Sequence, residues 1–441
     1  MDAVKKAQNR VTMSKAWTLL CMGVLSACIW GYASPAYSQS VGVNPDDIDS
    51  LPDEDSVLGR PRPEYSAQGV PLGGFRLYPA ITLGTFYDDN VFRAASDKEG
   101  DTFFEFAPQL SLRSQWTRHS LGMRASATRY QFSKFSSENK TDWTIVGNGR
   151  VDIATGMAFS AALQHLSTSE RRDSPDQINA AEPTPYEQTG AHLVFSYNPY
   201  RLGLQLAADF DRTTFGNTKV LAEAGGGEQD NHDRDRDDYT IVGTALYEFS
   251  PGYAAFLRPT YEKRIYDLQT ARAQGRNTEG YRIDTGVNLL LSRLIRGEVY
   301  AGYIREDLEG PSFEDLSGLD YGASLQWFPS EVITVHLDAS RIPAATTLVG
   351  ASLRDDRTVE IGVDYEFRRN VIVQADFQYI DAQFEGITRH DRNFSTQVGV
   401  RYLLNPYLSA NARFTHNNRD STEGGRTFSD NVVAISVNAH L

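Results

Sequence analysis

The side chains best placed to do chemistry in this 441-residue chain are charged ones that alternate with apolar ones. In residues 358–367 (TVEIGVDYEF), Glu360, Asp364 and Glu366 alternate with apolar side chains, and Arg413 does so in residues 407–416 (YLSANARFTH). A period of two places the two kinds of side chain on opposite faces of a β-strand. Charges gathered on one face attract and select ions and polar solutes. The chemistry indicated is therefore electrostatic selection.

These charges fall into a basic and an acidic set. The basic set comes from the early and the final segments of the chain, and the acidic set comes from the middle. If the first and last strands pair, the basic strands are contiguous, and we expect a basic and an acidic wall to face each other across a pore. The alternative is that mixed charge only keeps the lumen hydrated. The predicted basic wall is Arg113, Arg124, Arg150, Arg401 and Arg413. The predicted acidic wall is Asp209, Glu248, Glu298, Asp320, Glu360, Asp364, Glu366 and Asp376, with Arg258, Arg264 and Arg282 as exceptions among them.

Signals for catalysis or metal binding are weak. The sequence has no G-x-S-x-G, P-loop or H-E-x-x-H motif. Asp88-Asp89 and Asp230-Asn231-His232 resemble the acidic–histidine pairing of omptin proteases, but those enzymes use a much smaller barrel. The acidic cluster in residues 230–238 could attract Ca²⁺ but lacks the spacing of an EF-hand loop. We therefore expect no enzymatic activity, no cofactor and no metal, and keep a rim hydrolase as an alternative.

The elements that position the charges follow from the pattern between Arg76 and Leu441. Alternating runs of about ten residues are separated in turn by eight short turns and nine longer polar loops, which gives about eighteen strands. The last run, residues 431–441, ends the chain with an open edge that the first strand can pair with. We predict an all-β, transmembrane, antiparallel up-and-down β-barrel with short periplasmic turns and long extracellular loops. The alternative, a soluble β-sandwich, does not require this alternation.

Aromatic side chains gather beside the predicted short turns. Spread over several hairpins at one end of the sheet, they predict a girdle at the periplasmic membrane interface. The predicted girdle is Trp116, Tyr197, Tyr253, Trp327, Tyr402 and Tyr407.

The N-terminus has the pattern of a secretory signal. Four basic residues precede an apolar run, residues 16–33, and Ala36-Tyr37-Ser38 fits a cleavage site. We therefore expect residues 1–38 to be a cleaved signal peptide and the rest to be an integral protein of the bacterial outer membrane. The alternatives are a permanent anchor helix and a lipoprotein box ending at Cys28. Both cysteines lie in this segment, so the mature chain is expected to have no disulfide.

Residues 39–75 are rich in Pro, Asp and Glu and have no periodicity, so we expect a flexible periplasmic segment before a barrel at 76–441. It could be a simple linker, a tether for a periplasmic partner, or a segment that folds into the pore. Removing residues 1–38 takes the formal net charge from -14 to -17, which argues against nucleic acid as a partner. The mean hydropathy of -0.42 is compatible with a barrel whose faces alternate.

The start of the predicted barrel resembles a known family. Arg60-Pro61-Arg62-Pro63-Glu64-Tyr65, the Leu-x-Pro at residues 77–79 and Tyr87-Asp88-Asp89-Asn90-Val91 resemble the putative β-barrel porin 2 family of outer-membrane proteins. Some members are associated with exopolysaccharide or capsule export, and the resemblance implies such a role. It carries over no residue-level polysaccharide site.

The sequence thus predicts a porin-like channel for polar solutes, linked to polysaccharide export across the outer membrane. The alternative is a structural or adhesive barrel whose lumen is plugged by its loops or by residues 39–74. The expected partners are outer-membrane lipid and lipopolysaccharide, the barrel-assembly machinery, and polysaccharide or periplasmic export components.

Overall fold

The structure is a computed structural model that describes residues 55–176, 180–221, 225–268, 275–290, 294–310, 313, 315–348, 350–351 and 353–441. The predicted signal peptide and residues 39–54 lie outside these ranges. Within the described residues, no helix is both long and apolar enough to cross a membrane.

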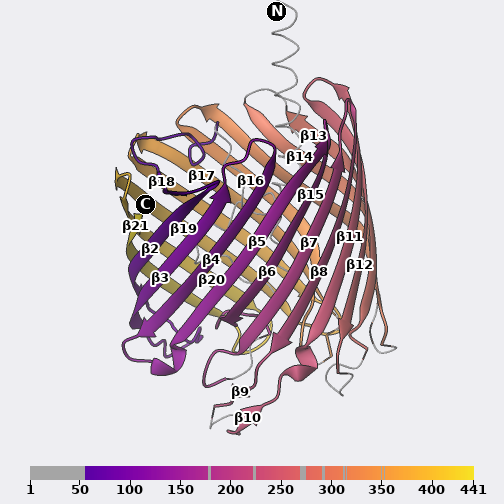
Figure 1. Cartoon of the computed structure of the whole chain (residues 1–441). Coiled ribbons are helices and arrows are strands. Elements are labelled where there is room, and N and C mark those ends of the chain that lie inside the picture. Colours follow the sequence, from indigo (N-terminus) through magenta and orange to yellow (C-terminus); the bar gives the residue numbers. More distant parts are fainter. Residues whose placement is uncertain are drawn as a thin grey trace, which may run out of the picture.

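Eighteen long antiparallel strands form one closed barrel, as the alternation of polar and apolar residues predicted (Figure 1). Each strand lies beside the next along the chain, and the ring closes where the last strand pairs with the first. The barrel strands are β2 (Phe75–Asp88), β3 (Asp101–Ser114), β4 (His119–Phe132), β5 (Lys140–Ala154), β6 (Met157–Ser169), β7 (Pro185–Tyr197), β8 (Leu202–Phe215), β11 (Arg236–Ser250), β12 (Tyr253–Tyr266), β13 (Thr278–Leu290), β14 (Ile295–Leu308), β15 (Leu316–Ser330), β16 (Ile333–Ala344), β17 (Arg354–Arg368), β18 (Val371–Phe384), β19 (His390–Asn405), β20 (Leu408–Ser421) and β21 (Phe428–His440).

The closing pair joins the two ends of the barrel sequence. Ala80 to Asp88 of β2 pair with Val432 to His440 of β21 in unbroken antiparallel register. This pairing removes the open edge that the final strand would otherwise expose. Both the first and the last strand therefore have hydrogen-bonded neighbours on each side.

The connections alternate between short turns at one end of the barrel and longer loops at the other, as predicted. The shorter elements are β1 (Val70–Leu72), which pairs with β2, the hairpin β9 (Thr218–Lys219) and β10 (Glu228–Gln229), and the 3-10 helices η1 (Ser136–Glu138) and η3 (His232–Arg234). The β9–β10 hairpin projects from the long-loop end, at the bottom of Figure 1. By the architecture of outer-membrane barrels, the short turns are periplasmic and the long loops extracellular.

The two faces of the barrel differ in composition. Large apolar side chains such as Leu163, Leu206 and Ile283 are more than half exposed and occupy the outer face, which lipid covers. Polar side chains such as Asn148, Gln164 and Asp320 occupy the alternate positions and are buried inside the ring. The outer face therefore supplies the hydrophobic contact with the membrane, and the inner face carries the charges.

Candidate functional site: the lumen

The five arginines of the predicted basic wall lie on strands that are contiguous in the closed barrel. Arg113, Arg124 and Arg150 are on β3, β4 and β5, and Arg401 and Arg413 are on β19 and β20, with β21 and β2 between the two groups. All five occupy the alternate positions that the polar inner-face residues occupy. The closure of the barrel thus brings together arginines that are up to 300 residues apart in sequence.

Further contacts within this sector hold several of the arginines in place. The guanidinium of Arg113 lies 5.6 Å from the ring centroid of Tyr78, and Arg76 is directly opposite Arg113 in the β2–β3 register. Arg150 Nε is 3.1 Å from an Asp152 carboxylate oxygen. Arg413 interacts electrostatically with Glu105 on β3. Glu105 and Asp152 thus lie beside the arginines, and further inner-face carboxylates, Asp88, Asp101, Asp391 and Asp430, are buried toward the extracellular end of the same strands.

The eight carboxylates of the predicted acidic wall lie on the inner face between β8 and β18, and each has a specific partner. Three pair with arginine: Glu298 with Arg258 at 2.9 Å, Asp320 with Arg282 at 3.0 Å and Glu366 with Arg62 at 2.5 Å. Asp209 pairs with His192, and Asp376 lies 3.2 Å from His336. The remaining three accept hydrogen bonds, Glu360 from Gln378, Asp364 from Gln374 and Glu248 from the backbone of Gly252.

The three arginines that were exceptions in the sequence pattern neutralise part of the acidic side. Arg258 and Arg282 bind Glu298 and Asp320, and Arg264 binds Asp238 at 2.6 Å. The strand order explains these contacts. Arg258 on β12 and Glu298 on β14, for example, are separated around the ring only by β13. The acidic side therefore consists largely of ion pairs and hydrogen-bonded carboxylates, and its net field is weaker than a count of carboxylates indicates.

One extracellular loop reaches across the lumen. The β6–β7 loop, residues 170–184, contacts strands and loops on a distant part of the ring. Asp176 Oδ1 accepts hydrogen bonds from the hydroxyl of Thr346 (2.6 Å) and the backbone N–H of Thr347 (2.9 Å) in the β16–β17 loop. The Pro175 carbonyl accepts one from Arg389 in the β18–β19 loop. Residues 177–179 of this loop lie outside the described residues.

The inner anchor of this crossing loop is a buried charge cluster. Arg389 and Arg419 are each 4% exposed and share the fully buried carboxylate of Asp391, at 2.6 and 3.8 Å. Arg419 also donates to the backbone carbonyl of Asp173. Burial raises the pKa of Asp173, but Arg171 and Arg93 outweigh it and hold this pKa at about 2. The loop is therefore tied to the far wall by charge-assisted contacts that sequence analysis did not identify.

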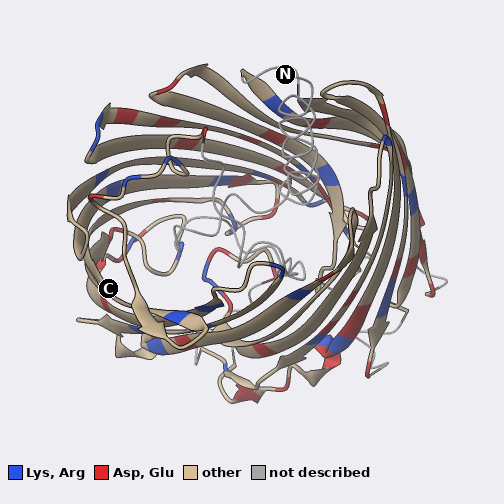
Figure 2. Cartoon of the chain, turned by 45° about the horizontal axis from the view of Figure 1, so that its top comes forward, with Lys and Arg blue, Asp and Glu red and all other residues tan. Residues whose placement is uncertain are grey.

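The periplasmic mouth holds the end of the N-terminal segment. From Asp55 onward the chain contacts the inner wall and turns of β14, β16 and β17 before β1 pairs with β2. Figure 2 shows the barrel with this end brought forward, with stretches of chain inside the ring of strands. Val57 is fully buried, and its backbone N–H donates to Thr334 Oγ1 at 2.8 Å. Arg62 is 5% exposed and bridges Glu366 and the Arg369 carbonyl. We call residues 55–72 the mouth segment. Of the segment expected to be flexible, residues 39–75, the structure describes residues 55–75, and the contacts above hold the mouth segment against the barrel.

Aromatic side chains also occupy the inner face, and sequence analysis did not single them out. Phe86, Phe103 and Tyr130 are nearly buried and pack with Phe132, with the Phe86 and Phe103 rings stacked at 4.8 Å. Phe86 is two residues from Asp88 on β2, and Phe103 is two residues from Asp101 on β3, so each aromatic shares a strand face with a carboxylate. This alternation is the sequence signal that could have placed them on the inner face. Because they are buried, they form a small core at the extracellular end of the lumen.

The predicted girdle residues lie beside the short turns. Trp116, Trp327, Tyr402 and Tyr407 are between 46% and 55% exposed, and Tyr197 is 36% exposed. Tyr253 begins β12 and its ring packs 6.2 Å from that of Phe249. Trp116 and Tyr407 lie in short turns, and the other four lie at the periplasmic ends of their strands.

The residues of the alternative rim hydrolase make separate local contacts. Asp88 pairs with Arg93 at 2.8 Å, and Asp89 accepts hydrogen bonds from Asn431. His232 pairs with Asp235, 3.0 Å away in its own loop. In the part of the chain that the structure describes, no group of three or more His, Cys, Asp or Glu side chains could hold a metal ion.

Comparison with known proteins identifies one family. Residues 62–441 match the family described as putative beta-barrel porin 2. Comparison with curated proteins finds no significant match.

Solved structures with a similar barrel include porins of Pseudomonas aeruginosa. OccK1 (OpdK) is 11% identical with a TM-score of 0.44, over 83% of this chain and 99% of that one. OccK3 (OpdO) is 14% identical with a TM-score of 0.44, over 83% and 96%. OccK2 (OpdF), solved in complex with glucuronate, is 12% identical with a TM-score of 0.45, over 85% and 100%. These similarities concern the barrel alone.

Proposed function

The chain belongs to the putative beta-barrel porin 2 family, and from this premise we propose that it is a water-filled channel that passes anionic polar solutes and serves polysaccharide export. Membership of this family makes it a porin-like β-barrel of the outer membrane. The porin-like fold indicates a non-enzymatic channel. The solute class and the export role are the proposal.

The observation that carries the proposal is the contiguous basic sector on the inner wall. Five inward-facing arginines come from neighbouring strands across the barrel closure, and Arg76 adds a sixth next to Arg113. Guanidinium groups bind carboxylates in a planar two-point geometry, which suits uronic-acid and other acidic sugars. Part of the opposite wall is neutralised by ion pairs with arginine, such as Arg282–Asp320. An anionic solute therefore meets attraction on one side without equal repulsion on the other.

The test is the single-channel conductance of the refolded protein in a planar bilayer, with and without acidic exopolysaccharide fragments. We expect a measurable conductance that acidic fragments block at lower concentration than neutral fragments of the same length. A conductance that both fragments affect equally would support a general porin and contradict the export role.

A plugged barrel is the second candidate, because chain segments occupy both ends of the lumen. The crossing loop contacts the far wall at the extracellular end, and the mouth segment contacts β14 to β17 at the periplasmic end. The absence of any conductance would favour this candidate, provided that the protein is folded. Folding is verified by the different electrophoretic mobility of the unheated and the heated protein.

The localisation and partners complete the proposal. Residues 1–38 direct export and are removed, and the barrel-assembly machinery inserts the strands. Periplasmic export components dock near the short turns, where the mouth segment emerges. Mass spectrometry of the N-terminus of protein purified from outer membranes would test the cleavage, with Gln39 as the expected first residue.

A further inference from the structure

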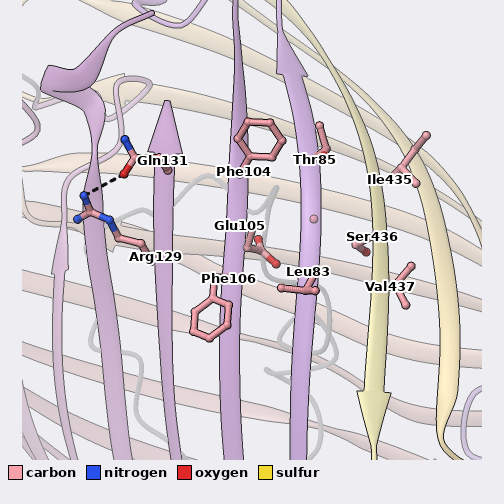
Figure 3. A pocket seen from close by; sticks show the side chains of 11 residues that line it. Leu83, Thr85, Phe104, Glu105, Phe106, Arg129, Gln131, Ile435, Ser436 and Val437 are labelled. Atoms are coloured by element: carbon pink, nitrogen blue, oxygen red, sulfur yellow. Dashed lines mark hydrogen bonds between the residues drawn. The ribbon is translucent and has the colours of Figure 1, made fainter. Parts of the chain in front are cut away.

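A groove of about 450 Å³ runs along the outer face of the barrel over the closing strands. Figure 3 shows its side chains, which come from β4, β3, β2 and β21. The registers arrange them in two rows of directly opposed residues. The upper row is Gln131, Phe104, Thr85 and Ile435, and the lower row is Arg129, Phe106, Leu83 and Val437.

The shape of the groove follows from side-chain size. In the upper row the short Thr85 lies between Phe104 and Ile435, so the surface dips over β2 between a phenylalanine ridge and an aliphatic one. The five apolar side chains of the two rows are between 41% and 63% exposed. In a membrane, lipid must cover such a surface, and a furrow of this kind fits an acyl chain.

One end of the groove carries a cation on the lipid-facing side of the barrel. Arg129 is exposed and lies three residues before β4 ends at Phe132, toward the extracellular loops. Its guanidinium donates only to the neutral oxygens of Thr141 (3.1 Å) and Gln131 (3.3 Å). Among the described residues it has no carboxylate partner. An arginine on the lipid face is destabilising unless it lies near the interface, where it can meet an anion.

Other outward arginines at this level lie beside carboxylates, whereas the residues opposite Arg129 are Phe106 and Thr141. Arg392 is directly opposite Asp381 in the β18–β19 register, and three others form ion pairs. Arg212 binds Asp237 and Asp267, Arg305 binds Asp307 at 2.6 Å, and Arg357 binds Asp355 at 3.0 Å. The groove is therefore the place where an apolar furrow ends at a cation without a protein counter-charge. That combination matches a lipid with an anionic head group.

We propose that the groove binds one phosphate-bearing lipid of the outer leaflet, with an acyl chain between the β3 and β21 ridges and its phosphate on Arg129 and Gln131. The position of Arg129 near the extracellular end sets the leaflet, because the groove descends from there to Leu83 in the middle of β2 and then toward Val437, three residues before β21 ends at His440. A phosphorylated glycolipid such as the lipid A portion of lipopolysaccharide has this chemistry. The bound lipid covers the seam where β2 meets β21.

A nearby tryptophan provides the readout. Trp143 lies on the outer face of β5, opposite Ala127 and two residues from Thr141, which accepts the Arg129 hydrogen bond. A full-length variant with the other four tryptophans replaced by phenylalanine leaves Trp143 as the only one. The variant is placed in phosphatidylcholine vesicles that contain an increasing fraction of one brominated lipid, either phosphatidic acid or phosphatidylcholine. Brominated acyl chains quench the fluorescence of Trp143 when they contact it, so the quenching reports which lipid lies in the groove.

We expect brominated phosphatidic acid to reach half-maximal quenching at about a fivefold lower fraction than the brominated phosphatidylcholine, since one basic side chain near a membrane contributes roughly that factor. Arg129→Gln should remove the preference and Arg129→Lys should keep it. Arg305→Gln, a matched change on the outer face of β14, should leave it intact. Thr85→Phe fills the furrow and should reduce quenching by both lipids.

Two results would overturn the proposal. One is equal quenching by the two lipids, or a preference that survives Arg129→Gln. The other is no quenching by either lipid together with cross-linked dimers, because a second copy of the chain would then cover the groove. Unheated gel mobility confirms that each variant is folded before the comparison.

Discussion

Individual carboxylates on the inner wall are stabilised by partners from distant parts of the chain. Glu366 binds Arg62, which is 304 residues earlier in the sequence, and Asp376 on β18 contacts His336 on β16 across the intervening strand β17. A buried charge without a partner is costly, so each inner-wall carboxylate that carries a negative charge needs one. The pairing lowers the electrostatic repulsion that each carboxylate exerts on anions in the pore, because a neutralised carboxylate repels anions much less than a free one.

Asp173 provides a pH-dependent test at the residue scale. Its pKa of about 2, below the usual 3.8, means that its charged form stabilises the crossing loop at all pH values above about 4. This contribution, about 2 kcal/mol, is lost as the pH falls from about 4 to 2. We expect the single-channel conductance to be constant between pH 7 and 4 and to rise below pH 3. In Asp173→Asn the conductance should already be high at pH 7.

Other carboxylates also titrate in that range, so the comparison depends on the difference between the two proteins. If the wild type and Asp173→Asn have the same conductance at pH 7, Asp173 does not hold the loop. Glu182→Gln serves as a control in the same loop, because Glu182 pairs with the exposed Lys219.

At the scale of elements, the mouth segment links the N-terminus to the barrel through one buried ion pair. Arg62 and Glu366 are both less than one-tenth exposed, and removing either partner leaves a buried charge that costs about 3–5 kcal/mol. We expect Arg62→Gln or Glu366→Gln to release the segment and raise the conductance. The double variant should match the single ones, since all three lose the same contact. Conductance changes that add would show that the two residues act independently.

Glu64→Gln is the matched control for that experiment. Glu64 is in the same segment and binds Arg369 at 2.9 Å, but both side chains are nearly half exposed. The Arg369 guanidinium lowers the pKa of Glu64, yet an exposed pair of this kind contributes little to stability. The conductance of Glu64→Gln should therefore equal that of the wild type.

The strands could be predicted from the sequence because their signals are local. The alternation in Val371–Phe384 assigns Phe377 to lipid and Asp376 to the lumen without knowledge of any other strand, and short turns such as Ser250-Pro251-Gly252 mark the strand ends. The loop contacts could not be predicted in this way. Asp176 meets Thr346 through a path that no periodicity encodes, and the same holds for Arg389 and Pro175.

On the scale of the whole molecule, barrel closure combines two distant parts of the sequence into one basic sector. Strands β3 to β5 and β19 to β20 are separated by more than 200 residues along the chain but only by β21 and β2 around the ring. The summed field of such a sector acts over the width of the lumen, where water and salt screen it less than in bulk solution. Ion selectivity is the property that reports this sum.

Charge reversal of the sector tests whether it sets the selectivity. Changing Arg113, Arg124, Arg150, Arg401 and Arg413 together to glutamate replaces five inner-wall cations by anions, so we expect the reversal potential in a KCl gradient to move toward cation selectivity. The matched control reverses Arg212, Arg305 and Arg357, whose side chains lie on the outer face and bind outer-face carboxylates. An unchanged reversal potential in the five-residue variant would show that these arginines do not line the conducting path. A shift of equal size in the control would show that surface charge sets the selectivity. If the basic wall sets the selectivity, the reversal potential should shift only in the inner-wall variant. The shift should also be smaller at high salt, because salt screens the charges.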